Sequence, residues 1–334
     1  MHEEPNPRFS VIVLNWNGKH LIRECLTSLR CQSYRDFEAI LVDNGSKDGS
    51  ADYVRQEFPE VRILELSSNL GFCGGNNRGI AIARGSYILP LNNDSELEPT
   101  ALAELDRAVR TDPPDVGFWA VRMRRWHQRD LIDNCGIGYS IFGAGYQIGA
   151  GDQDDGAFEE PAWIFGAPGG GACYRRSVLD DIGLFDEDFF YNNEDVDLSF
   201  RAQLAGYRCH YVPSVIVYHR GSVTVGPTSD KTVYHIQRNM EWAFLKNLPM
   251  GLMWKYLPLH CLHIVGWLGY WTARGKGRVV LRAKIDALQG WRKVREKRRE
   301  IQAKRRASLR YIDSLIRRRR VSCSERPGPR RSTR

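Results

Sequence analysis

The adjacent carboxylates Glu194 and Asp195 are the strongest candidates for acid–base chemistry in this sequence. From Val196 onward the apolar residues recur at helical spacing, so the pair lies in the first turn of a predicted helix, where the helix dipole favours negative charge. Capping of that helix is therefore one interpretation. Catalysis is the other, because the aromatic residues 189–191 just before the pair can exclude water and raise a carboxyl pKa, as a general base requires.

A second candidate site is Asp94, which follows two amides at the end of the apolar run 87–91. This run predicts a buried strand, and ligands of open α/β sheets bind outside the carboxyl ends of the strands. A carboxylate there can hold a hard divalent cation against a diphosphate, although Asn-Asp-Ser sequences also start turns. His219 ends another predicted strand, 211–218, and beside a candidate metal carboxylate it is a second candidate ligand.

The first part of the chain predicts the scaffold that would position these residues. Apolar runs at residues 9–14, 38–42, 62–66 and 87–91 predict strands, and helical patterns lie between them. This alternation indicates right-handed βαβ crossovers and a mostly parallel sheet. Turns rich in Asn, Asp, Ser and Gly follow the strands and meet at one edge of the sheet, so we expect a polar nucleotide-binding crevice. The first of these turns has neither the dinucleotide fingerprint nor a Walker A sequence.

The later part of the predicted sheet is less regular. Residues 116–121 predict a strand, and residues 135–157, rich in Gly and Asp, predict a mobile loop over the site. The consecutive glycines Gly169, Gly170 and Gly171 allow backbone to approach a ligand closely, although such runs are also flexible connectors.

Composition and charge place further bounds on the protein. The chain of 334 residues is 42% hydrophobic, enough for one large or two ordinary domains. Its net charge of +8 is unevenly distributed, because residues 1–273 carry 25 Lys/Arg against 35 Asp/Glu, whereas residues 274–320 carry 19 against 4. The eight cysteines form no C-x-x-C pair, so we expect a reducing cytosol and no zinc cage or disulfide framework. The first residues show no secretory-signal pattern.

The C-terminal part of the chain suggests a membrane surface. Residues 252–271 are apolar but include Lys255 and Pro258, so we predict a segment lying on the membrane; a buried core helix is the alternative, and a true span is less favoured. Beyond it, apolar residues from Ile285 to Leu315 fall on a helical stripe among arginines and lysines, which is typical of binding to an anionic membrane. A nucleic-acid partner is not expected, because this region has few aromatic residues and no recognised motif.

Taken in order, these motifs resemble the inverting nucleotide-sugar glycosyltransferases of family two, which have the GT-A fold. The resemblance covers residues 9–222 and is carried by Asn15-Trp-Asn17-Gly, Asp43-Asn44-Gly-Ser46, Asn69-x-Gly71-Phe, Asn76-x-x-Gly79, Asn92-Asn93-Asp94, Phe185-Asp-Glu, Glu194-Asp195-Val-Asp197 and His219-x-x-Ser222. The most similar subgroup is the rhamnosyltransferase-like enzymes of bacterial surface-polysaccharide synthesis. One departure is Asn92, where the family commonly has the first Asp of Asp-x-Asp. This change predicts weaker metal affinity, or more ligands from the donor diphosphate.

The resemblance implies roles for individual residues. Asp195 is the expected general base, with Glu194 beside it, and Asp94 and His219 are expected to hold Mg²⁺ or Mn²⁺. Asp43 is expected to accept the imide N–H of uracil or thymine. The full set of expected nucleotide-sugar-binding residues is Asn15, Asn17, Asp43, Asn44, Ser46, Asn69, Gly71, Asn76 and Asn93. The residues expected to bind the acceptor are Gly169, Gly170, Gly171, Trp163 and Arg201.

We therefore predict an α/β protein with a Rossmann-like GT-A domain over residues 1–240 and a mostly parallel central sheet. A helical membrane-associating extension, 241–320, and a disordered basic tail, 321–334, should follow, and removal of the chain from Arg274 should leave the domain folded. The expected enzyme moves a sugar from dTDP-rhamnose or a UDP-sugar to a hydroxyl of a glycan or polyprenyl-linked glycan, at the cytosolic face of the membrane. The alternatives are a nucleotide-sugar or polyanion binding protein without turnover, and a sugar nucleotidyltransferase, which would need a basic Gly-rich loop after the first strand.

Overall fold

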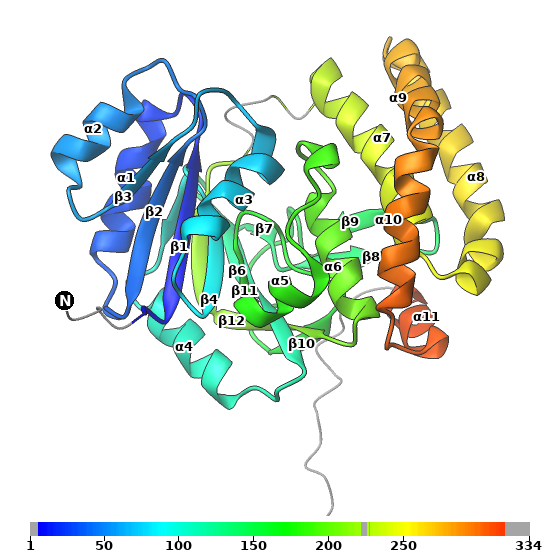
Figure 1. The fold of residues 1–334 in the computed structure, drawn as a ribbon. Helices are drawn as coiled ribbons and strands as arrows, with labels where there is room; N and C mark the ends of the chain where they lie inside the picture. The colour runs from blue at the N-terminus through cyan, green and yellow to red at the C-terminus, as the bar shows by residue number, and fades with distance from the viewer. Residues whose placement is uncertain (1–5, 222–225, 227, 318–334) are drawn as a thin grey trace, which may run out of the picture.

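Ten strands form one mixed sheet at the centre of the protein, with helices on both faces (Figure 1). The computed structural model describes residues 6–221, 226 and 228–317. Ser222 and the predicted tail 321–334 lie outside the described residues. The strands are β1 (Phe9–Asn15), β2 (Phe37–Asp43), β3 (Arg62–Glu65), β4 (Tyr87–Asn92), β5 (Ser95–Leu97), β6 (Val116–Arg125), β7 (Ile132–Asn134), β8 (Ile137–Tyr139), β9 (Gly145–Gln147), β10 (Ala162–Ile164), β11 (Ala172–Arg175) and β12 (Arg208–His219).

The helices up to residue 204 lie between strands in the chain, as the alternating pattern predicts, and those from residue 230 onward follow the last strand. They are α1 (Lys19–Arg30), α2 (Ser50–Glu57), α3 (Gly71–Ile82), α4 (Ala101–Thr111), α5 (Arg176–Ile182), the 3-10 turn η1 (Glu187–Phe189), α6 (Glu194–Leu204), α7 (Asp230–Asn247), α8 (Met250–Ala273), α9 (Gly277–Gln289), α10 (Trp291–Ala303) and α11 (Leu309–Arg317).

The four predicted N-terminal strands are confirmed and run parallel in the order β3-β2-β1-β4. In this register Asn15 lies opposite Asp43, and Leu14 lies opposite Asn92. The polar turns that follow these strands therefore meet at one edge. β11 runs antiparallel between β4 and β6, and β12 is parallel to β6, so the sheet is mostly parallel.

The predicted loop over residues 135–157 is wrong for residues 137–147, which form the antiparallel hairpin β8–β9. Cys135, Ile137 and Tyr139 are buried, and the Tyr139 ring stacks on Phe165 at 5.3 Å. Every second side chain of this segment is therefore apolar and packs in the core, as is typical of a strand. The many glycines around the segment make this periodicity hard to recognise in the sequence.

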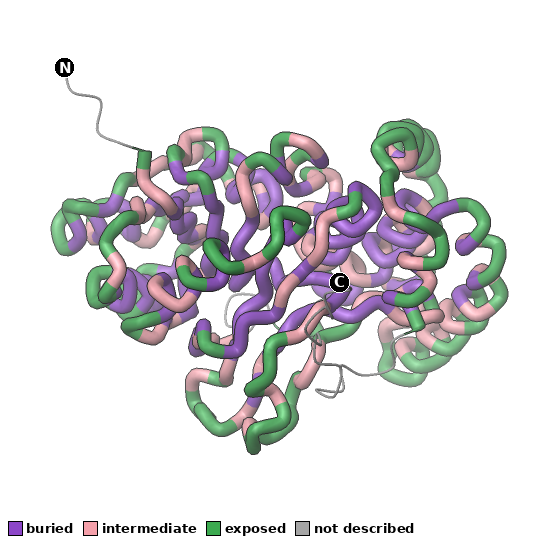
Figure 2. The backbone as a smooth tube through the Cα atoms, turned by 90° about the horizontal axis from the view of Figure 1, so that it is seen from below, coloured by how far each residue is buried: buried purple, intermediate pink, exposed green. Residues whose placement is uncertain are grey.

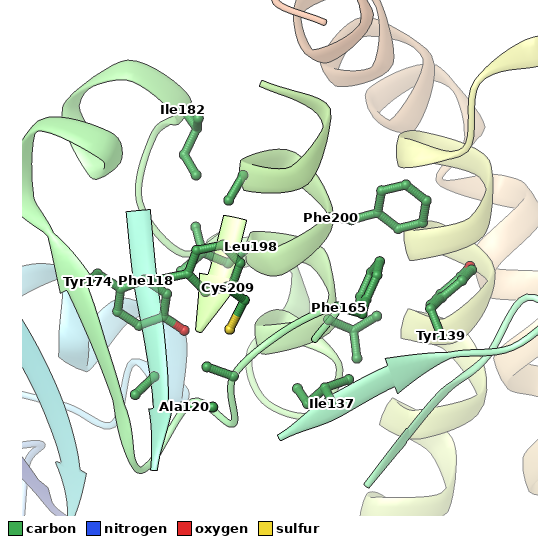
Figure 3. Packing of buried hydrophobic residues seen from close by; sticks show 14 of the residues in the cluster. Phe118, Ala120, Ile137, Tyr139, Phe165, Tyr174, Ile182, Leu198, Phe200 and Cys209 are labelled. Atoms are coloured by element: carbon green, nitrogen blue, oxygen red, sulfur yellow. The ribbon is translucent and has the colours of Figure 1, made fainter. Parts of the chain in front are cut away.

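Two hydrophobic cores lie on the two faces of the sheet. Side chains of α1, α2 and α4 pack on one face, and those of α3, α5 and α6 pack on the other. Figure 3 shows the second core, where Phe118 and Tyr174 from the sheet meet Leu198 of α6, and Phe165 packs against Phe200. This core fixes α6, the helix that begins with the two candidate catalytic carboxylates.

The C-terminal helices belong to the same core, so the predicted division at residue 240 is not the one that the structure shows. Residue 240 lies inside α7, and Phe244, Tyr256 and Ile312 are buried members of the core that holds α6. The helix α9 packs against α7, and its buried side chains include Val280. Removal of the chain from Arg274 would expose this core, so we expect it to destabilise the catalytic domain.

The predicted membrane segment is the helix α8, of which one side is buried and the other exposed. Leu252, Tyr256 and His260 form the buried side. Trp254, Leu262 and Val265 are 64%, 64% and 67% exposed, and at 100° per residue their side of the helix lies opposite. α8 is therefore not a buried core helix. None of the helices in the described part of the chain combines the length and hydropathy needed to cross a membrane.

Candidate active site

Five of the predicted donor-site residues form one hydrogen-bonded network at the ends of β1, β2 and β4. The Asn15 amide donates to Asp43 Oδ1 and to Ser46 Oγ, each at 3.3 Å. Asn93 donates to Asn15 Oδ1 at 2.7 Å, and the Asn17 backbone N–H donates to Ser46 Oγ at 2.9 Å. Asn15 and Asp43 are buried, so the network is fixed before any ligand binds.

Three of the other predicted donor-site residues, Asn44, Asn69 and Gly71, form a second network one strand further along the sheet. The Asn44 amide donates to Asn69 Oδ1 and to the Gly71 carbonyl, each at 3.1 Å. The Gly71 N–H donates back to Asn69 Oδ1 at 2.8 Å, and its φ of +74° is a conformation that favours glycine. Asn76, in α3, donates to the Phe72 carbonyl at 2.9 Å and leaves its own buried Oδ1 without a partner in the described structure.

Asp94 and His219, the two predicted metal ligands, are brought together. His219 Nε2 lies 3.3 Å from Asp94 Oδ1 and 3.1 Å from Asn92 Nδ2. On its other side, His219 Nδ1 lies 2.9 Å from Asp133 Oδ2. Burial by itself would lower the pKa of His219, but its hydrogen bonds and charge interactions with Asp133 and Asp94 raise the pKa to about 10.

The donor set around His219 fits a divalent cation that is shared with a bound diphosphate. Asp94 offers a carboxylate oxygen. Because its pKa is raised, His219 would have to release its Nε2 proton when the cation binds, and its opposite nitrogen is oriented by Asp133, as is usual for metal-binding histidines. Within residues 6–221, 226 and 228–317 there is no cluster of three His, Cys, Asp or Glu that could hold an ion alone. The remaining ligands would therefore be phosphate oxygens and water, which Mg²⁺ readily accepts.

A pocket of about 430 Å³ joins this cluster to the candidate catalytic carboxylates. Asn92, Asp133 and His219 lie in its lining, and Glu194 and Asp195 do too. The rest of the lining comes mainly from α3, from the β8–β9 hairpin, from the glycine run and from the segment before α6: Phe72, Met123, Asn134, Ile137, Gly145, Tyr146, Gln147, Pro168, Gly169, Gly170, Tyr191, Asn192, Asn193, Val196 and Ile236.

The carboxyl groups of Glu194 and Asp195 have raised pKa values. Burial is the main cause for both, and the charge of Asp195 raises the pKa of Glu194 further, well above its usual value. Backbone N–H groups of Gly169 and Val196 donate to Asp195 at 3.2 and 2.8 Å and oppose part of its shift. The two hydrogen bonds therefore favour the ionised form of Asp195, and the charge of Asp195 favours the protonated form of Glu194. The buried Glu194 Oε2 has no hydrogen-bond partner in the described structure.

The segment before α6 has an unusual backbone. Phe190, Asn192 and Asn193 have φ values of +66°, +65° and +62°, a region that is costly for Phe and tolerated by Asn. The buried amide of Asn239, in α7, donates to the carbonyls of residues 189, 191 and 192 at 2.9, 2.9 and 2.7 Å. This side chain holds the strained segment in place and so positions the carboxylates that follow.

The predicted acceptor-site residues divide into two groups. Gly169 and Gly170 line the pocket, and Gly171, beside them, forms a bridge with Leu91 of β4. Trp163 and Arg201 do not line this pocket.

The side chains of Trp163 and Arg201 both make contacts within the protein, away from the pocket. Trp163 packs on the His210 ring at 4.8 Å. The buried Arg201 pairs with Asp197 at 2.9 Å and donates to the carbonyls of residues 182, 183 and 184. The helical spacing of Asp197 and Arg201 is the sequence signal for this pairing.

Sequence reasoning missed three contributors to the site: Asp133, Tyr146 and Asn239. Asp133 reaches His219 because β7 pairs with β6, and β7 is too short to be recognised from periodicity. Tyr146 reaches the pocket through the unpredicted hairpin. A buried Asn in the middle of a helix, as at position 239, is unfavourable for the helix itself and could have indicated a specific hydrogen-bonding role.

Comparisons with known proteins agree with this architecture. The model of glycosyl transferase family 2 matches residues 10–183, and that of glycosyl transferase family group 2 matches residues 120–281. The N-acetylglucosaminyl-diphospho-decaprenol L-rhamnosyltransferase of Mycobacterium tuberculosis is 27% identical over 314 residues, which cover 84% of this chain and 93% of that protein.

Two solved structures share the fold. The mannosyltransferase PcManGT of Pyrobaculum calidifontis, in complex with GDP-Man and Mn²⁺, superimposes with a TM-score of 0.53 at 18% identity, covering 85% of this chain and 87% of that one. Residues 1-349 of S. aureus TarS, in complex with UDP, give a TM-score of 0.51 at 19% identity, covering 88% and 91%. The α/β fold is thus GT-A-like. Since the family 2 model alone matches more than half of the chain, the protein belongs to glycosyl transferase family 2 and is a transferase enzyme.

Proposed function

We propose that the protein is an inverting glycosyltransferase that moves a sugar from a nucleoside diphosphate sugar to a hydroxyl of a glycan acceptor. The observation that carries this proposal is that one pocket contains both a diphosphate-side cluster, with Asn92 and His219, and a carboxyl pair of raised pKa. A sugar held between the two would have its leaving group on one side and a proton acceptor on the other.

In the proposed mechanism, Asp195 accepts the proton of the acceptor hydroxyl as that oxygen attacks the anomeric carbon. One in-line displacement breaks the bond to the diphosphate and inverts the configuration, so no carboxylate nucleophile is needed. A protonated Glu194, which its raised pKa favours, would keep a second negative charge away from the attacking oxygen. General-base catalysis of this kind contributes typically about 10²–10⁴-fold.

Asp94 and His219 would hold a divalent cation, Mg²⁺ or Mn²⁺, against the donor diphosphate. A cation bound there supplies electrostatic stabilisation of the negative charge on the leaving group. The two residues also orient the diphosphate, and Asp133 keeps the His219 ring in position. Mn²⁺ in the similarly folded mannosyltransferase supports this assignment.

The donor base would lie against the network of Asn15, Asn17, Asp43 and Ser46, with Asp43 accepting the imide N–H of thymine or uracil. The similarity to a rhamnosyltransferase favours dTDP-rhamnose, with UDP-sugars as the alternative. The same relative is named for an acceptor linked to a polyprenyl diphosphate, so we infer a lipid-linked glycan acceptor and a place in envelope polysaccharide synthesis.

We also propose that the enzyme works at the inner face of the cell membrane as a peripheral protein. Leu281, Ile285 and Leu288 of α9 are exposed on one side of that helix, and α8 exposes its own apolar side next to α9. The exposed rim of these C-terminal helices is visible at the right of Figure 2. A lipid surface would cover these side chains and concentrate the enzyme beside its acceptor.

A donor screen tests the proposed function. dTDP-rhamnose, UDP-sugars and GDP-mannose are each added with Mn²⁺, and the unfolding temperature is followed. One thymidine or uridine donor should stabilise the protein by about 2.7 kcal/mol at a concentration of about 100 times its dissociation constant. The stabilisation should be lost in Asp43→Ala. Equal stabilisation by all three bases would contradict the role of Asp43.

A further inference from the structure

A second cavity lies among the C-terminal helices. It has a volume of about 480 Å³ and is bounded by the start of α8, one side of α10 and the start of α11. Figure 1 shows these three helices together at the right of the molecule, away from β1–β3. Met250, Trp291 and Leu309 provide an apolar wall, and all three are partly exposed at its mouth.

Arginines form the rest of the wall. Arg295 and Arg299, four residues apart on α10, are exposed and have no ion pair among the residues that the structure describes. Lys293 and Lys297 point to another side of the helix, where both pair with aspartates next to η1. Lys293 and Lys297 are thus neutralised by aspartates of the catalytic domain. Arg295 and Arg299 lie on the side of α10 that faces the cavity, and no carboxylate pairs with them in the described structure.

Two further features make the cavity attractive to an anion. Arg298 is buried in its floor and donates to the carbonyls of Leu245 and Leu248, each at 2.7 Å, which fixes the guanidinium beside the cavity. The first turn of α8, including Gly251, lines the cavity too. The N–H groups of Leu252 and Met253 donate to the Pro249 carbonyl, whereas those of Met250 and Gly251 have no carbonyl partner within the helix. Asp and Glu are missing from the cavity lining in the described part of the chain.

We propose that this cavity binds the phosphate-bearing head group of an anionic phospholipid, with the first acyl carbons against the apolar wall. This proposal rests on the membrane association proposed above, and it names the cavity as one place where the protein contacts a lipid. Arginine side chains match the phosphate, and a lipid alone uses both the charged and the apolar parts of the lining. Met250 also begins the exposed apolar side of α8 that contains Trp254, so an acyl chain leaving the cavity would follow the surface that faces the bilayer.

The test compares two double variants of the full-length protein by co-sedimentation with vesicles. Arg295→Gln/Arg299→Gln removes two charges from the cavity, and Arg278→Gln/Arg310→Gln removes two exposed charges elsewhere on the C-terminal helices. On vesicles of phosphatidylcholine with phosphatidylglycerol, the cavity variant should lose about tenfold or more of its partitioning, and the control variant clearly less. On pure phosphatidylcholine the two should bind equally. Equal losses in both variants on the anionic vesicles would overturn the proposal.

A soluble probe separates a lipid site from a phosphate site. Monomeric dihexanoyl phosphatidylglycerol should raise the unfolding temperature of the wild type and not that of the cavity variant. Inorganic phosphate that stabilises as well as the lipid would contradict the role of the apolar wall. Donor-dependent stabilisation, measured without vesicles, should be the same in all variants. Its absence from the wild type would refute the proposed transferase reaction and leave the vesicle result intact.

Discussion

Asp195→Asn should lower kcat by about 10²–10⁴-fold while the dissociation constant of the donor stays near that of the wild type. The Asn side chain has the size of Asp but cannot accept the acceptor proton, and Asp195 is expected to face the acceptor rather than the nucleotide. Steady-state kinetics together with calorimetric donor binding measure the two quantities separately. A variant that keeps more than about a tenth of kcat would show that the base lies elsewhere, because loss of a general base costs at least about 10²-fold.

Glu194→Gln is the matched control for this prediction. Because burial and the neighbouring charge of Asp195 raise the pKa of Glu194 well above its usual value, a neutral amide resembles its native state. We expect kcat to fall by less than about tenfold, the size of one lost or altered hydrogen bond. If Glu194→Gln were inactive and Asp195→Asn active, Glu194 would be the general base and Asp195 its neighbour.

The raised pKa of Asp195 also predicts the pH dependence of the wild type. The base works only when ionised, so kcat should fall as the pH decreases through that pKa. Because burial raises the pKa, this acid limb should lie above the pH at which an exposed Asp would titrate. If kcat instead fell at the pH where an exposed Asp titrates, the result would contradict the burial of Glu194 and Asp195 in the working enzyme.

Removal of divalent metal should stop turnover and weaken donor binding. EDTA should abolish transfer, and Mn²⁺ or Mg²⁺ should restore it. Asp94→Ala and His219→Ala should each weaken donor binding in the presence of Mn²⁺, because each removes one of two protein ligands. Asp133→Asn should weaken metal affinity by about 10–100-fold, since Asp133 only orients the ring of His219.

Asn92→Asp is a control that should change metal affinity in the opposite direction. It restores the carboxylate that the family commonly has at this position, next to His219, and should tighten metal binding. Metal affinities can be measured by titration of donor-dependent stabilisation. Full activity of the wild type in EDTA would refute the proposed role of the cation, and unchanged donor affinity in His219→Ala would remove that residue from the ligand set.

The fold was predictable where the sequence pattern is local. The apolar runs of β1 to β4 are continuous because both faces of a parallel sheet are covered, and the polar turn after each strand marks its carboxyl end. The same local rule placed Asn15, Asp43 and Asp94 at one edge, where the structure has them.

Features that depend on contacts distant in sequence were not predictable. The C-terminal helices showed an apolar stripe from Ile285 to Leu315 among basic residues, which predicts a membrane-binding face. In the structure, Val294 and Ile312 of this stripe are buried against the protein, whereas Ile285 of α9 is 45% exposed. Arg201 was expected to bind the acceptor, but α6 directs its guanidinium to Asp197 and to a backbone carbonyl inside the protein.

The configuration of the new glycosidic bond tests the account most directly. The protein is incubated with Mn²⁺, dTDP-rhamnose or the UDP-sugar that stabilises it best, and a short-chain prenyl-diphosphate-linked N-acetylglucosamine. The anomeric configuration of the new glycosidic bond is then assigned by NMR. A single displacement assisted by Asp195 predicts a product of configuration opposite to that of the donor. A product that retains the donor configuration would require two displacements and would contradict the mechanism.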